Sequence, residues 1–438
     1  MPTGRAKDIL EIFHKQITHR IRYLLTPMFR PLFFVFSAIS MTSGTKTEGK
    51  RTAPIVHEAY VWQYNWNENV RKIFELNKVP EKIKGLKVLV GETGIESNPR
   101  SINVPWGLLK STGRNVTICV RAGTKGAVTK SGGVNLGDAE RLIVKALDDC
   151  RQSGLEPRSV QLDFDCPERL IGIYADRLNE IRRRLGGCAL GVTALPAWLD
   201  SKDLPKLLSS VEEWTLQVHW TEIPIFSEKT RLFRRQEAMG WIRKASRMGK
   251  SLNVALPTYC YVAYFDNELR YLGVSSEIRK IPNRSAHTLV LESDPSEIIN
   301  TMKDLSTSEF EGVRGVDWFR LPMPDDRFNW DMKGLSAVLD ERAPNHQVRV
   351  DVAKSGSAFD LRIRNDSPFP IKTSTVRARW QGTELIATDA VTGWKPMPDR
   401  DGVRFQSEPG ATVIAPYESR AIGWIRLCDS TRLEVDAH

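Results

Sequence analysis

The sequence predicts an α/β protein in which a (β/α)8 TIM barrel is followed by an all-β sandwich-like module. Eight apolar, strand-like segments recur between residues 54 and 342, and helical patterns separate most of them. Beyond residue 348 the pattern changes to short alternating segments divided by Gly, Pro, Asn and Asp. An open doubly wound sheet is the alternative architecture, but no Gly-rich dinucleotide fingerprint follows the first predicted strand.

The predicted barrel strands are short apolar runs bounded by turn-forming or polar residues. They cover residues 55–64, 86–90, 116–120, 160–165, 189–195, 215–220, 252–256 and 316–321. Apolar residues at helical spacing predict helices at 136–153, 170–185, 204–210, 234–248 and 295–305. The Gly-containing stretch 124–133 lacks a phosphate-binding lysine motif, so we predict a flexible loop there.

The C-terminal module is predicted from five short segments with the two-residue period of strands. They lie at 348–352, 359–364, 375–380, 413–414 and 421–426. We therefore expect a barrel domain at 54–342 and a β-sandwich accessory domain at 348–438. Such a module braces the catalytic domain or binds a partner.

The N-terminal segment 1–50 differs from the rest of the chain in charge. The 438 residues carry a net charge of +10, and residues 1–50, with eight Lys/Arg and three Asp/Glu, account for half of it. A mildly basic body without a basic stripe argues against a nucleic-acid partner. The apolar run 32–41 is too short to span a bilayer and follows several arginines, which predicts a secretory signal and export from the cytoplasm. The alternative is a surface helix at 8–25 that associates with a membrane.

Several classes of active site lack their motifs in this sequence. The six cysteines form no CxxC pair, and the seven histidines form no HxH or HExxH spacing, so we predict no metal. No GxSxG nucleophile elbow occurs. We predict no cofactor, and we expect the cysteines to be small buried hydrophobic residues.

The segment 159–168, Ser-Val-Gln-Leu-Asp-Phe-Asp-Cys-Pro-Glu, carries the candidate catalytic residues. Asp163 and Asp165 share one face of the predicted fourth strand, at the carboxyl end where barrel enzymes have their sites. Two neighbouring carboxylates suit acid–base chemistry, because they cannot both ionise cheaply. The alternative is an ion pair with a basic residue on a neighbouring strand. Glu168 is a third candidate, although acids are also common in the first turn of a helix.

Residues at the ends of other strands are candidates for substrate binding. Glu92 follows the second strand in a Gly-flanked stretch, with a solvated loop acid as the alternative. Gln217 and His219 share a face of the sixth strand, although His219 equally fits a buried core histidine. Flat aromatic rings can stack on sugar rings and hydrogen-bond through their polar tips. The aromatic candidates are Trp62, Tyr64, Trp66, Trp220, Tyr259 and Tyr261.

The predicted eighth strand leaves two orientations open. Asp317 and Phe319 share one of its faces, and Trp318 and Arg320 share the other. An inward Arg320 would neutralise an acid of the fourth strand or bind an anionic group of the substrate. The alternative for Arg320 is a structural ion pair.

Four motifs together resemble a known family. They are Gln-Leu-Asp-Phe-Asp-Cys-Pro-Glu-Arg-Leu at 161–170, Tyr-Ala-Asp-Arg-Leu at 174–178, Thr-Ala-Leu-Pro-Ala-Trp-Leu at 193–199 and Leu-Gln-Val-His at 216–219. With them the sequence resembles the bacterial domain-of-unknown-function family 3142, over the barrel and the C-terminal module. The resemblance implies a glycosidase-like barrel of unassigned substrate.

A more distant similarity is to the chitinase-type barrels, whose fourth strand ends in Asp-x-Asp-x-Glu. Asp163 and Asp165 match the two aspartates of that motif. The proton-donating glutamate would fall at Pro167, and Glu168 lies one position too late. This departure leaves Asp165 as the better candidate for the acid.

These observations lead to two hypotheses of different classes. The first is an exported glycoside hydrolase or glycan-processing enzyme that acts on an oligo- or polysaccharide, with Asp165 as general acid and Asp163 as its electrostatic partner. The second is a glycan-binding or scaffolding protein that keeps the barrel without turnover, which the missing glutamate favours.

Overall fold

The computed structural model describes most of the chain beyond its N-terminal segment. It covers residues 51, 53–94, 98–219, 222–227, 229–275, 282–342, 348–373, 375–400, 402–408, 413–429 and 432–437. The signal and surface-helix predictions for residues 1–50 lie outside the described residues. Among the helices that the structure describes, none is both long and apolar enough to cross a membrane.

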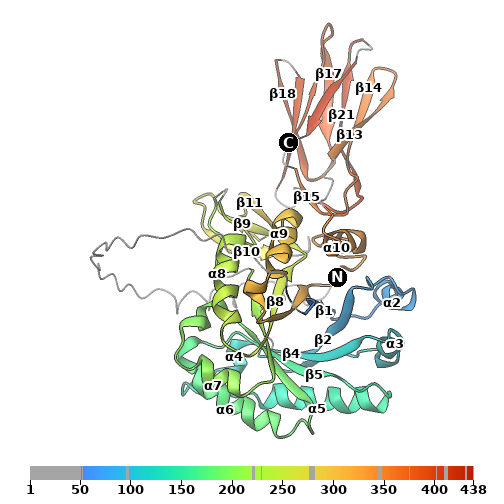
Figure 1. Ribbon diagram of the computed structural model, residues 1–438. Coiled ribbons are helices and arrows are strands. Elements are labelled where there is room, and N and C mark those ends of the chain that lie inside the picture. Colours follow the sequence, from blue (N-terminus) through green and yellow to red (C-terminus); the bar gives the residue numbers. More distant parts are fainter. Residues whose placement is uncertain are drawn as a thin grey trace, which may run out of the picture.

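Eight parallel strands form a closed barrel, which confirms the predicted fold class (Figure 1). They are β1 (Val56–Val61), β2 (Ile83–Thr93), β4 (Asn115–Ala122), β5 (Ser159–Phe164), β6 (Ala189–Ala194), β7 (Glu213–Gln217), β8 (Ser251–Pro257) and β12 (Val313–Phe319). The ring closes because β1 pairs in parallel with both β2 and β12. Each of the eight strands overlaps one of the segments predicted from the sequence.

The strand β5 shows how the sequence builds the wall of the barrel. Alternate residues point outward and are almost completely buried in the main core, namely Val160, Leu162 and Phe164. The residues between them point into the barrel, namely Ser159, Gln161 and Asp163. The apolar half of the strand therefore holds the fold together, while the polar half is available to the barrel interior.

Helices follow most of the strands and cover the outside of the barrel (Figure 1). They are α2 (Glu68–Glu75), α3 (Trp106–Ser111), α4 (Thr124–Ala127), α5 (Gly137–Gln152), α6 (Ile171–Arg182), α7 (Leu204–Ser209), α8 (Arg235–Ser246), α9 (Pro295–Leu305) and α10 (Met332–Leu339). Side-chain caps set several starts, since Asn67 accepts from Val70 N and Asp294 accepts from Ser296 N. The short α4 lies inside the stretch 124–133, which the sequence predicted to be a loop.

A three-stranded antiparallel sheet between β8 and α9 was not predicted. It consists of β9 (Cys260–Phe265), β10 (Tyr271–Ser275) and β11 (His287–Glu292), in the order β10-β9-β11. Every residue of β9 is buried, so this strand lacks the polar alternation that identifies a strand in sequence. A two-residue strand, β3 (Arg100–Ser101), also pairs antiparallel with the end of β2.

The C-terminal part of the chain contains two four-stranded antiparallel sheets that face each other. One has the order β13-β14-β21-β17, and the other has the order β18-β19-β16-β22. Their bounds are β13 (Val348–Ser355), β14 (Ala358–Asn365), β16 (Thr375–Arg379), β17 (Leu385–Ala390), β18 (Trp394–Asp399), β19 (Gly402–Ser407), β21 (Ser419–Leu427) and β22 (Glu434–Ala437). Inward residues such as Phe359, Phe405 and Ile425 form a core of their own.

The short pair β15 (Ile371–Lys372) and β20 (Val413–Ile414) lies where these sheets meet the barrel. Phe369 packs into the main core, where its ring lies 5.2 Å from that of Trp330. An ion pair between Arg327 and Glu418, with a separation of 2.6 Å, also crosses this junction. The C-terminal sheets extend away from the barrel on this side (Figure 1).

Candidate functional site

The end of β5 places Asp163 at the carboxyl-terminal mouth of the barrel. Its side chain is 20% exposed, so solvent reaches it. Thr193 at the end of β6 donates its hydroxyl to Asp163 Oδ1 at 2.6 Å. On the other side, Arg121 of β4 brings Nε to 3.9 Å from Oδ2. Two neighbouring strands therefore fix this carboxylate from both sides, while it stays accessible.

Arg121 also links Asp163 to a second acid, Glu92 of β2. Glu92 is buried, and its Oε1 accepts a hydrogen bond of 2.7 Å from the hydroxyl of Tyr64. Burial raises the pKa of Glu92, because it disfavours the charged carboxylate more than Arg121 and Tyr64 favour it. Burial acts to lower the pKa of Arg121, but Asp163 and Glu92 outweigh it, so that pKa is raised. Arg121 thus interacts with one accessible acid, Asp163, and one buried acid, Glu92.

Glu92 lies in a strand and not in the predicted loop, because β2 continues to Thr93. The register of β2 against β4 shifts between Leu89 and Gly91, which turns the following residues. A Cβ at Gly91 would lie 2.6 Å from the carbonyl oxygen of Arg100, so glycine permits the close approach of β3. The guanidinium group of Arg100 lies over the ring of Tyr64, 4.5 Å from the ring centroid.

Aromatic rings form one wall of the mouth, around Phe319 at the end of β12. The ring of Phe319 lies 5.4 Å from that of Trp62 and 5.7 Å from those of His219 and Tyr259. His219 is nearly parallel to Phe319, at an angle of 27°, and shares a hydrogen bond of 3.0 Å between its Nδ1 and the Tyr259 hydroxyl. These contacts hold the rings in fixed orientations. The inward face of β12 is therefore the one with Asp317 and Phe319.

A layer of buried polar residues lies beneath the mouth. Lys87 Nζ contacts Asp317 Oδ2 at 2.6 Å, and neither side chain has any exposed surface. Asp317 also accepts hydrogen bonds from Thr215 at 2.6 Å and from Asn253 at 2.9 Å. Gln161 donates to the same Thr215 hydroxyl at 2.9 Å, so the network reaches the strand that carries Asp163.

The other predicted site residues have different environments. Asp165 directly follows β5, and its charge also acts on Arg121. Glu168 is exposed on a short 3-10 helix (Glu168–Leu170). The side-chain amide of Gln217 donates to the carbonyl oxygen of His219 at 3.1 Å. Arg320 forms an ion pair with Asp326 at 2.6 Å, which is the structural alternative considered for it. Trp220 lies outside the described residues.

Sequence reasoning missed Arg121, Thr193, Phe319 and Lys87 as parts of this region. Lys87 had a usable signal, because a lysine inside an apolar strand is costly unless a partner is buried with it. Arg121 lies one residue beyond the end of the predicted third strand, and Thr193 lies in a quoted motif. Among the residues that the structure describes, no group of three or more His, Cys, Asp or Glu side chains is arranged to hold a metal ion.

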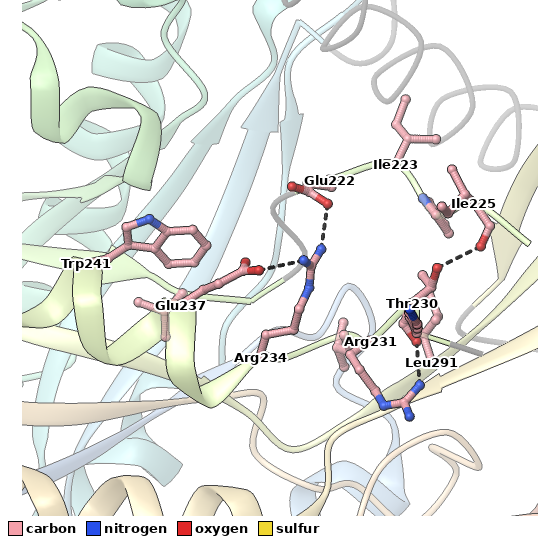
Figure 2. Close-up of a pocket in the computed structure, with 13 residues that line it drawn as sticks. Glu222, Ile223, Ile225, Thr230, Arg231, Arg234, Glu237, Trp241 and Leu291 are labelled. Atoms are coloured by element: carbon pink, nitrogen blue, oxygen red, sulfur yellow. Dashed lines mark hydrogen bonds and ion pairs between the residues drawn. The ribbon is translucent and has the colours of Figure 1, made fainter. Parts of the chain in front are cut away.

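A separate pocket of about 200 Å³ lies beside the mouth, between the loop after β7, helix α8 and strand β11. Arg234 lies between Glu222 and Glu237 and contacts them at 2.5 Å and 2.6 Å (Figure 2). Trp241 of α8 lies on the side of Glu237 in the same view. Of the predicted site residues that the structure describes, none lines this pocket, although Val218, next to His219, does.

Comparison with known proteins identifies a family and similar solved structures. No curated protein sequence matches this chain. The spore cortex-lytic enzyme SleL of Bacillus cereus is 12% identical over 78% of this chain and 86% of that chain, with a TM-score of 0.45. Chitinase ChiA74 of Bacillus thuringiensis is 9% identical over 89% of this chain and 100% of that chain, with a TM-score of 0.42. Residues 112–324, slightly less than half of the chain, match the model of DUF3142, a domain of unknown function, which is the family that the motifs resemble.

Proposed function

We propose that the chain is a glycoside hydrolase or another glycan-processing enzyme, with its active site at the mouth of the barrel around Arg121. The observation that carries this proposal is the pair of acids that Arg121 links, Asp163 and Glu92. Glycoside hydrolysis needs one carboxyl group that keeps its proton and another that acts as a carboxylate. The raised pKa of Glu92, caused by its burial, suits the first task.

The proton donor has two candidates. The sequence favours Asp165, which matches the second aspartate of the chitinase-type motif. The environment favours Glu92, because its burial raises its pKa although the hydrogen bond from Tyr64 and the charge of Arg121 act in the opposite direction. In either case Asp163, held by Thr193 and Arg121, serves as the electrostatic partner or assists the attacking group.

The aromatic wall supports a sugar as the substrate. Phe319, the most exposed of these rings, lies at the carboxyl end of its strand, and C–H groups on one face of a pyranose ring pack well against such an aromatic face. Gln217, His219 and Trp220 remain predicted contacts of the substrate, and Arg320 is the weakest of these candidates because it is paired with Asp326.

The test is hydrolysis of a panel of soluble oligosaccharides and polysaccharides by the full chain and three variants. We expect product release by the wild type, with a loss of about 100-fold or more in whichever of Asp165→Asn and Glu92→Gln removes the proton donor. Glu156→Gln, an exposed acid of the loop after α5, is the matched control and should keep full activity. Equal activity in all variants would show that the reaction does not use these acids.

A non-catalytic glycan-binding protein is the second candidate function. Pro167 occupies the position of the proton-donating glutamate in the chitinase-type motif, and Glu168 is exposed. Binding of the same glycans without products, unchanged in Asp165→Asn and Glu92→Gln, would favour this candidate.

We also propose that the protein is exported and that residues 348–438 form an accessory domain of the barrel at 54–342. The basic, apolar segment 1–50 supports export or association with a membrane surface. Cell fractionation of the chain with and without residues 1–50 tests the first point. Separate expression of residues 54–342 and 348–438, followed by thermal unfolding, tests the second.

A further inference from the structure

The outward face of the sheet β13-β14-β21-β17 presents a tryptophan between two acids. Trp424 of β21 is 36% exposed. In the register of the sheet it is paired with Asp360 of β14 on one side and with Asp389 of β17 on the other. Residues that are directly opposite in antiparallel strands have their side chains on the same face. One indole ring is therefore flanked by a carboxylate on each neighbouring strand.

The surroundings leave this ring uncovered. Arg426, two residues further along β21, is exposed on the same face. The residues opposite Arg426 are both alanines, Ala358 of β14 and Ala387 of β17. The residue opposite Asp360 on the edge strand β13 is Ala353. Small side chains therefore occupy three of the positions around Trp424, and the long side chains of the same face nearby are Arg426 and Arg362, which lies two residues from Asp360 on β14.

The charged residues around Trp424 differ from other charged residues of the two sheets. Further along the same face Asp351 pairs with Arg364 at 3.2 Å, and on the other sheet Asp399 pairs with Arg377 at 3.1 Å. Asp360, Asp389 and Arg426 form no ion pair with any residue in the described part of the chain. Within the described residues, the side chain of Asp389 accepts one hydrogen bond, from its neighbour Ala390 N at 2.8 Å. Three charged groups around an exposed indole are therefore available to a ligand.

The chemistry of this face indicates which ligand it fits. An aromatic face attracts the weakly positive C–H groups on one side of a pyranose ring. Carboxylates accept, and guanidinium groups donate, hydrogen bonds to the hydroxyl groups at the ring edge. The two carboxylates beside the indole oppose the phosphates of a nucleic acid, and a single tryptophan is small for the core of a protein interface.

We propose that Trp424, Asp360, Asp389 and Arg426, the Trp424 platform, bind a neutral polysaccharide strand. A pyranose ring stacks on the indole, and its hydroxyl groups bond to the flanking carboxylates and the guanidinium. This site is separate from the mouth of the barrel and does not depend on turnover there. It gives the C-terminal sheets the task of holding an insoluble substrate.

The experiment measures binding of the full chain to suspensions of chitin, cellulose and mannan by co-sedimentation. We expect the wild type to bind at least one of them, and Trp424→Ala to bind it at least about tenfold more weakly. Asp360→Asn combined with Asp389→Asn removes the carboxylates without removing the ring, and we expect a similar loss. If Trp424→Ala does not fold, binding by this double variant still tests the proposal.

Two matched variants serve as controls. Tyr417→Ala removes an aromatic ring that is 48% exposed outside the platform, and Asp399→Asn removes a carboxylate of the other sheet. Both should bind like the wild type, and because binding is measured without turnover, a failure of the proposed catalytic function does not affect this test. Absence of binding to all three suspensions, or equal binding by the wild type and both platform variants, overturns the proposal. It is also overturned if Trp424→Ala changes only the oligomeric state, because the face then contacts protein.

Discussion

Lys87 Nζ and Asp317 Oδ2 lie 2.6 Å apart at the centre of the barrel, where neither side chain has exposed surface. Glu58 contributes a second carboxylate oxygen, 3.8 Å from the same ammonium group. Burial acts to lower the pKa of Lys87, but Asp317 and Glu58 more than compensate, so the pKa is raised. The charged pair is stable inside the protein because Thr215 and Asn253 also donate to Asp317.

The first prediction is that Lys87→Met strongly destabilises the protein. Removal of the ammonium group leaves Asp317 buried without its partner, which costs about 3–5 kcal/mol in the free energy of unfolding. Urea unfolding monitored by tryptophan fluorescence measures this loss. Lys244→Met removes an exposed partner of Asp200 and should change the free energy of unfolding by less than about 1 kcal/mol. Similar effects of the two substitutions would show that the central pair is not energetically coupled.

The second prediction concerns the effect of Glu92 on the free energy of unfolding. Because burial raises the pKa of Glu92, its carboxylate costs stability above that pKa, and the folded state favours the protonated form. Glu92→Gln removes this cost but keeps an acceptor for the Tyr64 hydroxyl. We expect the variant to be equally stable at pH 5 and more stable than the wild type at pH 8, by about 1 kcal/mol. Urea unfolding at both pH values tests this, and a variant that is less stable at pH 8 would contradict the expected protonated acid.

The third prediction uses Arg121 to move the pH dependence of catalysis. Arg121 favours the charged form of Glu92, so Arg121→Gln should raise the pKa of Glu92 further. If Glu92 donates the proton, the alkaline limb of the profile of kcat/KM against pH moves upward by about one pH unit. The control is Arg151→Gln, which removes an exposed partner of Glu156. A limb that stays in place would show that the proton donor is not an acid whose pKa depends on Arg121.

The strands of the barrel could be predicted because both of their faces are largely buried. Their apolar runs are visible in sequence even where the period is imperfect. Helix ends could also be predicted, because Asp294 and Pro295 mark the start of α9 and Gly249 follows the end of α8. The strand β9 could not be predicted in the same way, because only two residues separate it from β8 and all of its residues are buried.

The site was less predictable than the fold, because it depends on which strands become neighbours. The sequence places Asp163 at a strand end, but the positions of Arg121 and Thr193 beside it follow from the strand order β4-β5-β6. Glu92 was predicted in a loop because Gly91 resembles a strand end. Only the pairing of β2 with β3 shows that Gly91 is needed inside the strand.

His57 of β1 is held in its neutral form by the fold. Trp318 Nε1 donates to His57 Nδ1 at 3.3 Å, so this nitrogen must be unprotonated to accept the bond. Burial, together with the charge of Lys82, lowers the pKa of His57 to about 4. The unfolded chain has a histidine pKa of about 6.5 and therefore binds a proton more readily in this interval.

The fourth prediction is that this difference makes stability depend on pH between about 6.5 and 4. The folded pKa is lowered, so the contribution of His57 is fully present above about pH 6.5 and is lost as the pH falls toward 4. His57→Asn keeps a side-chain acceptor for Trp318 but does not titrate. We expect the variant to lose about 2 kcal/mol less free energy of unfolding than the wild type between pH 7 and pH 4.5. Urea unfolding at several pH values measures the two slopes, and equal slopes would mean that the pKa of His57 is the same in the folded and the unfolded chain.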